Sequence, residues 1–174
     1  MKGFTLLETT VAIAVLIVGI LGPLSMATFT LSRSSLSENE IVAYNLAVEA
    51  LEFVINTRDT NIFEGDNWLD GLDESANNCD HSDGCYIDVT ETNLANQVRQ
   101  CATPTTCPFI KRDASSGLYN YSTGSDTIFR RRIYLDNNDL DNNDERIVRV
   151  TVTWNEKFAA NKSIVIEHHI FERE

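Results

Sequence analysis

Apolar residues fill the first thirty positions of the chain almost without interruption, and they predict a helix that crosses a membrane. No charged residue occurs from Thr9 to Ser32, and residues 11–24 read VAIAVLIVGILGPL. A stretch of about 20 apolar residues is long enough to span a bilayer as one α-helix. We therefore expect residues 4–32 to form a transmembrane helix.

Beyond Arg33 the apolar residues recur at steps of three and four, which is the spacing of one face of an α-helix. We expect the helix to continue to about residue 57, with residues 33–57 forming an amphipathic half that buries this face against a globular domain. The residues of this face are Ile41, Tyr44, Val48, Leu51 and Ile55, with Ala47 and Val54 beside them.

Two features of the sequence oppose a straight, continuous helix. Pro23 lacks an amide hydrogen and clashes with the preceding turn, so it is expected to kink or locally unwind the helix. The serines of residues 32–37 compete for backbone hydrogen bonds, and Ser37 with Glu40 fits a capping box. A helix break near residues 33–37 is therefore the alternative to one uninterrupted helix.

The C-terminal third alternates apolar and polar residues in the manner of β-strands. The pattern predicts strands over residues 128–135, 147–154 and 163–171, and their short connections favour an antiparallel meander. A further strand is expected over residues 86–89, and little regular structure over residues 90–127. Residues 58–84 are polar and turn-rich, with Trp68, Leu69 and Leu72 as anchors. The predicted fold class is α+β, a long N-terminal helix packed on a C-terminal antiparallel sheet.

Glu8 is a lone carboxylate one turn inside the apolar segment, where an acid is costly and marks a functional site by default. Before it lie Met1-Lys2-Gly3 and then Phe4-Thr5-Leu6-Leu7. This leader has no apolar stretch of its own, so it is not an ordinary signal peptide. Lys2 is the only charge before the helix, which predicts an N-terminus on the cytoplasmic side.

The run Gly3-Phe4-Thr5-Leu6-Leu7-Glu8 before an apolar helix resembles the type IV prepilin superfamily. The resemblance implies cleavage by a prepilin peptidase between Gly3 and Phe4, followed by methylation of Phe4. It also implies that Glu8 pairs with the N-terminal amine of a neighbouring subunit in a filament, and that a pilin fold lies beyond the helix. The alternatives are a plain membrane anchor and a single-pass membrane sensor or ligand-binding protein that never polymerises.

The resemblance also divides the chain and implies its partners. Residues 1–3 are a leader, 4–32 the membrane half of the helix, 33–57 its amphipathic half, and 58–174 a globular domain. The expected partners are other subunits, the peptidase, a membrane assembly platform and, before assembly, inner-membrane lipid. The domain is expected outside the cytoplasm. The stretch from Leu46 to Glu52 and the strand ending in Trp154 look most like the minor-pilin and pseudopilin class designated V and I in pilus and type II secretion systems.

The charge balance argues against nucleic acid as a direct partner. The chain has 174 residues and a net charge of −12, and phosphate binding needs clustered Lys and Arg. The one basic cluster, Arg130-Arg131-Arg132, lies in a predicted strand, where alternate side chains point apart. We interpret it as a solvated face.

Four cysteines form two C-x5-C units, Cys79 with Cys85 and Cys101 with Cys107. An even count in an exported domain predicts disulfides. The local pairing is the simplest, while the other two connectivities stay open. Zinc is the rival interpretation, although structural zinc sites usually have C-x2–4-C spacing.

Residues 136–145 read DNNDLDNNDE, and such oxygen-rich segments suit hard cations such as calcium. The segment lacks the glycine and the bidentate acid of a calcium-binding loop, and Asp and Asn are also ordinary turn residues. A solvated loop is therefore the main interpretation. Calcium is the alternative, with Asp136, Asp139, Asp141 and Asp144 as ligands.

The sequence predicts no enzyme and no required cofactor. It contains no phosphate-binding glycine loop, metalloprotease helix or nucleophile elbow. His168 and His169 are adjacent in a predicted strand and so face opposite ways, and Glu49 and Glu52 on the helix are expected to be solvated.

Overall fold

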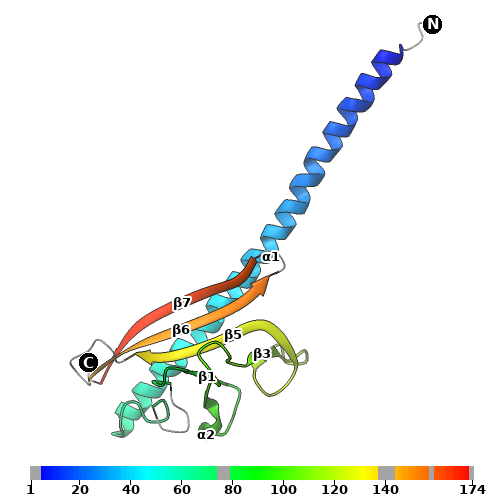
Figure 1. The fold of residues 1–174 in the computed structure, drawn as a ribbon. Helices are drawn as coiled ribbons and strands as arrows, with labels where there is room; N and C mark the ends of the chain where they lie inside the picture. Colours follow the sequence, from blue (N-terminus) through cyan, green and yellow to red (C-terminus); the bar gives the residue numbers. More distant parts are fainter. Residues whose placement is uncertain (1–4, 74–78, 137–143, 157–158, 173–174) are drawn as a thin grey trace. The chain divides into compact units, whose positions relative to one another are not determined.

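The computed structural model describes residues 5–73, 79–136, 144–156 and 159–172. Tertiary contacts group residues 1–40 and 41–174 into two units, and each is described by itself. One helix, α1 (Leu6–Glu64), contributes residues to both (Figure 1). The α+β prediction is confirmed at this level: an apolar N-terminal helix and a C-terminal antiparallel sheet.

The first unit contains the apolar part of α1. Residues Leu6–Thr30 form a 25-residue segment with a mean hydropathy of 2.3, and none of the segment is buried by the rest of the protein. By length and composition this segment can cross a membrane. The helix remains continuous through Pro23 and through residues 33–37, so this structure contains neither local unwinding at Pro23 nor the helix break at the serines.

α1 ends at Glu64 rather than near residue 57, so the predicted C-terminal boundary was several residues too early. Gly65 follows with a φ of 81°, in the left-handed region that glycine adopts without strain. The amide of Gly65 donates to the Ile62 carbonyl at 3.2 Å, and that of Asp66 donates to the Asn61 carbonyl at 3.0 Å. These two bonds form a Schellman cap, which satisfies carbonyls left open at the helix end.

Three long strands form the meander expected from the alternating pattern: β5 (Ser125–Asp136), β6 (Glu145–Glu156) and β7 (Ala159–Phe171). Each pairs antiparallel with the next, for example Ile133 with Val150 and Val150 with Ile166. Figure 1 shows β5, β6 and β7 side by side in that order. The prediction of three consecutive antiparallel strands is confirmed.

Four short strands and a short helix complete the second unit: β1 (Cys85–Ile87), α2 (Leu94–Gln97), β2 (Val98–Gln100), β3 (Phe109–Arg112) and β4 (Tyr119–Asn120). β1 and β3 both pair with β5 along the edge opposite to β6. Most of residues 90–127 has no regular structure, as expected, but the sequence did not predict β2, β3 and β4, because strands this short show no alternating pattern.

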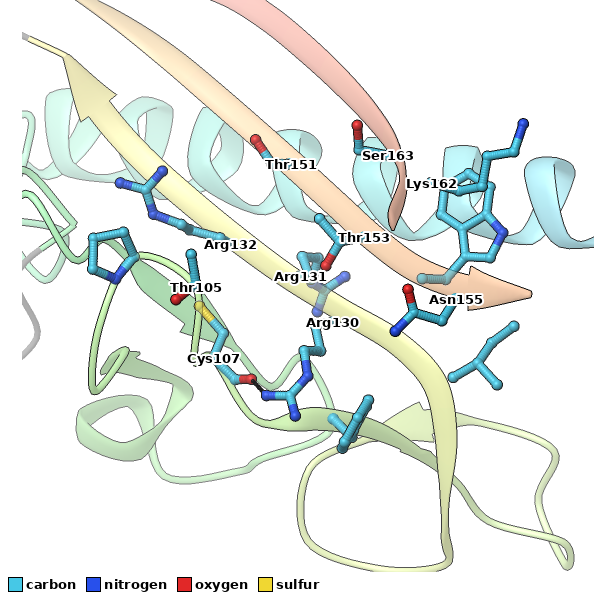
Figure 2. Close-up of a pocket in the computed structure, with 14 residues that line it drawn as sticks. Thr105, Cys107, Arg130, Arg131, Arg132, Thr151, Thr153, Asn155, Lys162 and Ser163 are labelled. Atoms are coloured by element: carbon cyan, nitrogen blue, oxygen red, sulfur yellow. Dashed lines mark hydrogen bonds between the residues drawn. The ribbon is translucent and has the colours of Figure 1, made fainter. Parts of the chain in front are cut away.

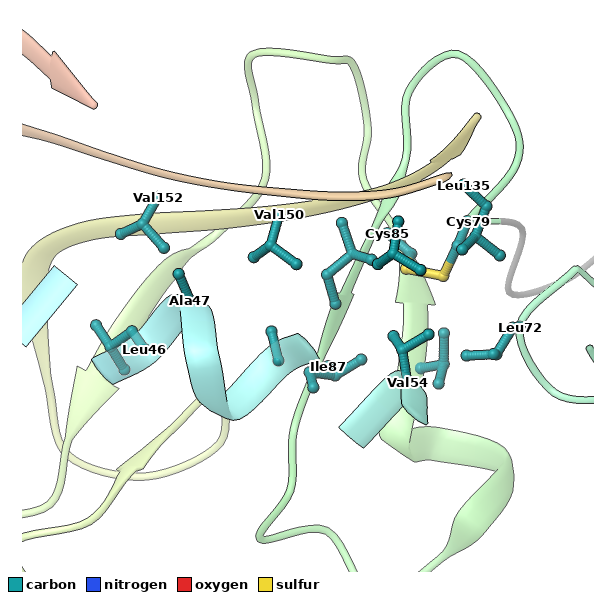
Figure 3. Packing of buried hydrophobic residues seen from close by; sticks show 14 of the residues in the cluster. Leu46, Ala47, Val54, Leu72, Cys79, Cys85, Ile87, Leu135, Val150 and Val152 are labelled. Carbon is teal, nitrogen blue, oxygen red and sulfur yellow. A yellow bond between two sulfur atoms is a disulfide. The ribbon is translucent and has the colours of Figure 1, made fainter. Parts of the chain in front are cut away.

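The core lies between the sheet and residues 41–64 of α1 (Figure 3). The helix presents mostly small residues to the sheet, and all five are at most 4% exposed: Ala43, Leu46, Ala47, Ala50 and Val54. They pack with Ile133, Leu135, Val148, Val150 and Val152 of the sheet. Side chains this small let the helix backbone approach the strands closely.

The predicted core stripe of the helix is therefore confirmed only in part, because Ala47 and Val54 are buried and Leu51 and Ile55 pack against the core. Ile41 and Tyr44 are 60% and 53% exposed, and Val48, Leu51 and Ile55 are half-buried. The stripe is shifted around the helix from the buried alanines. Periodicity identified an apolar face correctly, but another face, rich in alanine, is the one that the sheet covers.

The anchors predicted for the segment after α1 are confirmed. Trp68, Leu69 and Leu72 are at most 6% exposed and belong to the core. The Asn61 side-chain amide on the last turn of α1 donates to the carbonyls of Trp68 at 3.3 Å and Asp70 at 3.0 Å. These bonds fasten the segment to the helix end.

Candidate functional site

Glu8 lies in the first turn of α1, three residues after Thr5. Its amide donates to the Thr5 carbonyl at 3.0 Å and to the Thr5 hydroxyl at 3.3 Å. Thr5 thus caps the helix, and Thr-x-x-Glu is the sequence of a capping box. Within the described residues no hydrogen bond or ion pair involves the Glu8 carboxylate. Gly3 and Phe4, the predicted cleavage and methylation positions, lie outside the described residues.

A partly exposed apolar stripe of α1 is a second candidate surface: Ile41 and Tyr44 are exposed, while Leu51 and Ile55 also pack against the core. Ile41, Tyr44, Val48, Leu51 and Ile55 follow one another at steps of three, four, three and four residues. That alternation is the a/d seam through which two helices pack in a coiled coil. The stripe therefore has the spacing of a helix–helix contact surface.

Arg131 is buried, contrary to the prediction that the basic cluster is a solvated face. It is 2% exposed and faces α1, where its Nη1 donates to the Glu49 carboxylate and to the Leu46 carbonyl at 2.5 and 2.8 Å. Its Nη2 donates to the Ile87 carbonyl of β1 at 2.8 Å. A single guanidinium thus joins the helix, β5 and β1.

The Arg131 guanidinium keeps its charge in the core. Burial lowers its pKa, but nearby Tyr121 and Glu49 raise it by more, so the net shift is upward. Burial also raises the pKa of Tyr121. The Tyr121 hydroxyl interacts with Arg131 electrostatically without a hydrogen bond of ordinary geometry. Glu49, which the sequence suggested would be solvated, is instead the counterion of this buried cation.

Arg130 and Arg132 point to the opposite side of the sheet, as strand alternation requires. Figure 2 shows both beside an open groove that is also bordered by Thr105 and Cys107. Both side chains are half-buried. The sequence correctly placed these two arginines on the face away from the core, but it gave no sign of the groove.

The structure pairs Cys79 with Cys85 and Cys101 with Cys107, the local connectivity predicted from the sequence. The first pair is fully buried in the core cluster, whereas the second lies outside that cluster. The Cys79 carbonyl accepts a hydrogen bond from the Leu135 amide at 2.8 Å, and the Cys101 amide donates to the Gly84 carbonyl at 2.9 Å. Both disulfides thus fasten loops to the sheet.

Only two of the four suggested calcium ligands can be placed, because Asp139 and Asp141 lie outside the described residues. Asp136 lies 3.5 Å from the Arg149 guanidinium, and the Asp144 carbonyl accepts a hydrogen bond from the Glu172 amide at 2.8 Å. In the part of the chain that the structure describes, no group of three His, Cys, Asp or Glu side chains is arranged to hold a metal ion.

Comparison with protein-family models, with curated proteins and with solved structures finds no match to this chain. The fold and the candidate sites define an α+β protein whose N-terminal helix has the length and composition of a membrane span, and whose domain holds two disulfides. A functional proposal must therefore be argued from the residues themselves.

Proposed function

We propose that the protein is a subunit of a type IV pilus-like or type II secretion-like filament, processed between Gly3 and Phe4 and assembled through its N-terminal helix. The observation that carries the proposal is Glu8, an acid in the first turn of a long apolar helix. A carboxylate in an apolar segment needs a partner. The amine released on Phe4 of an adjacent subunit would supply the opposite charge.

The capping box offers a simpler role for Glu8, and the two roles can be separated. Glutamine serves as well as glutamate at this position of a capping box, but it has no charge to pair with an amine. Glu8→Gln should therefore impair filament incorporation as strongly as Glu8→Ala, while Glu8→Asp should be milder. All three variants should remain in the membrane fraction. Normal incorporation of Glu8→Gln would assign Glu8 to capping and remove the pairing role.

Two further features support the proposal. The partly exposed stripe from Ile41 to Ile55 has the spacing of a helix–helix contact, which a filament of parallel subunits would use. Two disulfides suit a domain exposed to oxidising conditions outside the cytoplasm. A single-pass sensor would share the disulfides but would need neither processing at Gly3 nor the exposed stripe.

Mass spectrometry of the mature N-terminus tests the processing step. We expect a chain that begins at a methylated Phe4. A mature chain that begins at Met1, or at any residue after the apolar helix, would contradict assignment to this superfamily.

The resemblance to class V and I minor pilins and pseudopilins is the narrower proposal. Co-purification with a filament assembly platform, rather than with a sensory complex, would support it.

A further inference from the structure

The sheet has an outward face, opposite to α1, that is occupied by cations and hydroxyl groups. Arg130 pairs in register with Thr153, which pairs with Ser163. Arg132 pairs in the same way with Thr151 on β6. Side chains of residues that pair directly lie on the same face about 5 Å apart. The outward face therefore carries two guanidinium groups next to three hydroxyls.

The segment closed by the Cys101–Cys107 disulfide forms a wall beside this face (Figure 2). Pro104, Thr105 and Cys107 from this segment, together with Phe109, border a groove of about 570 Å³. Pockets of about 300–1,000 Å³ are the usual size of small-molecule sites. The groove is open to solvent, so a ligand needs no conformational change to reach the arginines.

Both guanidinium groups are held in place by the protein. Arg130 donates from Nη1 to the Cys107 carbonyl at 2.5 Å and stacks 3.7 Å from the Phe109 ring centroid. Arg132 donates from Nε and Nη2 to the carbonyls of Asp83 and Ser82 at 2.9 and 2.7 Å. Carbonyls are neutral acceptors, so these bonds fix the side chains without neutralising them. Nε and Nη2 of Arg130, and Nη1 of Arg132, make no hydrogen bond with another described residue.

Among the residues that the structure describes, no Asp or Glu lines the groove, although the whole chain carries a net charge of −12. Lys162 also borders the groove, although it pairs in register with Trp154, which belongs to the opposite face of the sheet. Burial lowers the pKa of Arg132, and the negative charge of Asp83 opposes that shift. The Asp83 carboxylate itself lies 3.1 Å from His81. Arg149, farther along the same sheet face, has the opposite environment, because it is paired with Glu167 at 2.6 Å and with Asp136 at 3.5 Å. Arg130 and Arg132 are thus cations without a carboxylate counterion in the groove.

We propose that this groove binds a small ligand through an oxyanion, carboxylate or phosphate, held by Arg130 and Arg132 with the neighbouring threonine hydroxyls. Fixed guanidinium groups match the paired oxygens of such anions and bind them more tightly than neutral donors do. The threonine and serine hydroxyls give further hydrogen bonds to an oxyanion or to hydroxyl groups on the ligand. This inference does not depend on filament assembly.

The test uses the full chain in non-ionic detergent micelles, titrated with citrate and, separately, with pyrophosphate at low ionic strength. We expect saturable binding of at least one probe, which identifies the preferred oxyanion, and weakening as salt is added. Thr153→Asp places a carboxylate opposite Arg130 without removing any contact that holds Arg130. It should weaken binding at least tenfold, and by clearly more than the matched uncharged variant Thr153→Asn, which removes a hydroxyl but adds no negative charge.

Arg130→Gln and Arg132→Gln should each weaken binding at least tenfold, while Arg149→Gln, on the same face but already paired, should change it less than twofold. Tryptophan fluorescence checks that each variant is folded, because Trp68 and Trp154 are both buried. Failure of the wild type to bind either probe at about 10 mM, a concentration at which even millimolar affinity would be detected, would overturn the proposal. Equal losses in Thr153→Asp and Thr153→Asn, or in Arg149→Gln and Arg130→Gln, would also overturn it.

Discussion

Glu8 and Glu49 are carboxylates on the same helix, but only Glu49 has a partner within the described part of the chain. Glu49 pairs with the buried Arg131 at 2.5 Å. Glu8 lies in a segment in which every described side chain is exposed. The first half of α1 is apolar without being covered by this chain, whereas the second half is covered on one face by the sheet. The comparison shows that the first half is long and apolar enough to cross a membrane, whereas the second half is built to pack on the sheet.

The two halves also differ in the size of their apolar residues. The uncovered segment Leu6–Thr30 is rich in leucine, isoleucine and valine. The covered face of the second half is mainly alanine, because it must fit closely against a sheet. Lipid fills space around large side chains, while a rigid sheet leaves room only for side chains of matching size.

The largest expected effect concerns the ion pair of the covered half. Arg131→Ala leaves the Glu49 carboxylate and the Leu46 and Ile87 carbonyls without their donor, so unfolding free energy should fall by about 3 kcal/mol. Urea unfolding followed by fluorescence of the two buried tryptophans measures the loss. Arg149→Ala, which breaks an exposed pair, should cost less than about 1 kcal/mol. A loss below 1 kcal/mol for Arg131→Ala would show that this buried pair is not what holds the helix on the sheet.

A lysine introduced into the first half of α1 should reduce membrane insertion, whereas a lysine in the second half should not. Ile17→Lys places a charge near the centre of the apolar segment and should reduce membrane insertion by about 2.5–3.5 kcal/mol, measured as the membrane-inserted fraction in an insertion assay. Ile41→Lys, at a position 60% exposed, should leave insertion unchanged and alter unfolding by less than about 0.5 kcal/mol. Equal insertion of the two variants would mean that residues 6–30 do not cross the membrane.

The two disulfides allow a comparison within residues 41–174. Both join cysteines six positions apart, so loop closure alone should contribute about 2 kcal/mol for each. Changing both Cys79 and Cys85 to alanine should cost more than changing both Cys101 and Cys107, because only the first pair lies in the core. Unfolding of the two double variants tests this order. Equal losses would show that packing around Cys79 and Cys85 adds little.

Asp73 is a half-buried acid with acidic neighbours, and replacing it should change the unfolding free energy least. Burial, followed by the charge of Asp80, raises its pKa above the ordinary 3.8. The folded state therefore binds this proton more tightly than the unfolded state, and stability is lost as pH rises through the folded pKa. Asp73→Asn should stabilise the protein by less than about 0.5 kcal/mol at pH 7 because solvent screens the site. The gain should vanish below pH 3.8 in unfolding experiments; a gain that is independent of pH would contradict the electrostatic cause.

The sequence by itself predicted the features that depend on local pattern. Twenty apolar residues suffice to identify a membrane-length helix, and period-two alternation suffices for β5, β6 and β7. Short spacing favoured the local pairing of the cysteines but left the other two connectivities open. The sequence also predicted that Arg130 and Arg132 share one face and Arg131 the other. In each case the signal lies within a few neighbouring residues, where backbone geometry alone relates side chains to one another.

Tertiary structure alone decided which of two apolar faces of α1 is buried and which arginine enters the core. Ala47 and Tyr44 both lie on apolar faces of the helix, but Ala47 packs in the core with the strands while Tyr44 is exposed. Arg131 is buried because Glu49, far away in the sequence, lies opposite it. The short strand β1 forms for the same reason, since Cys85 pairs with Ile133 of β5, far away in the sequence.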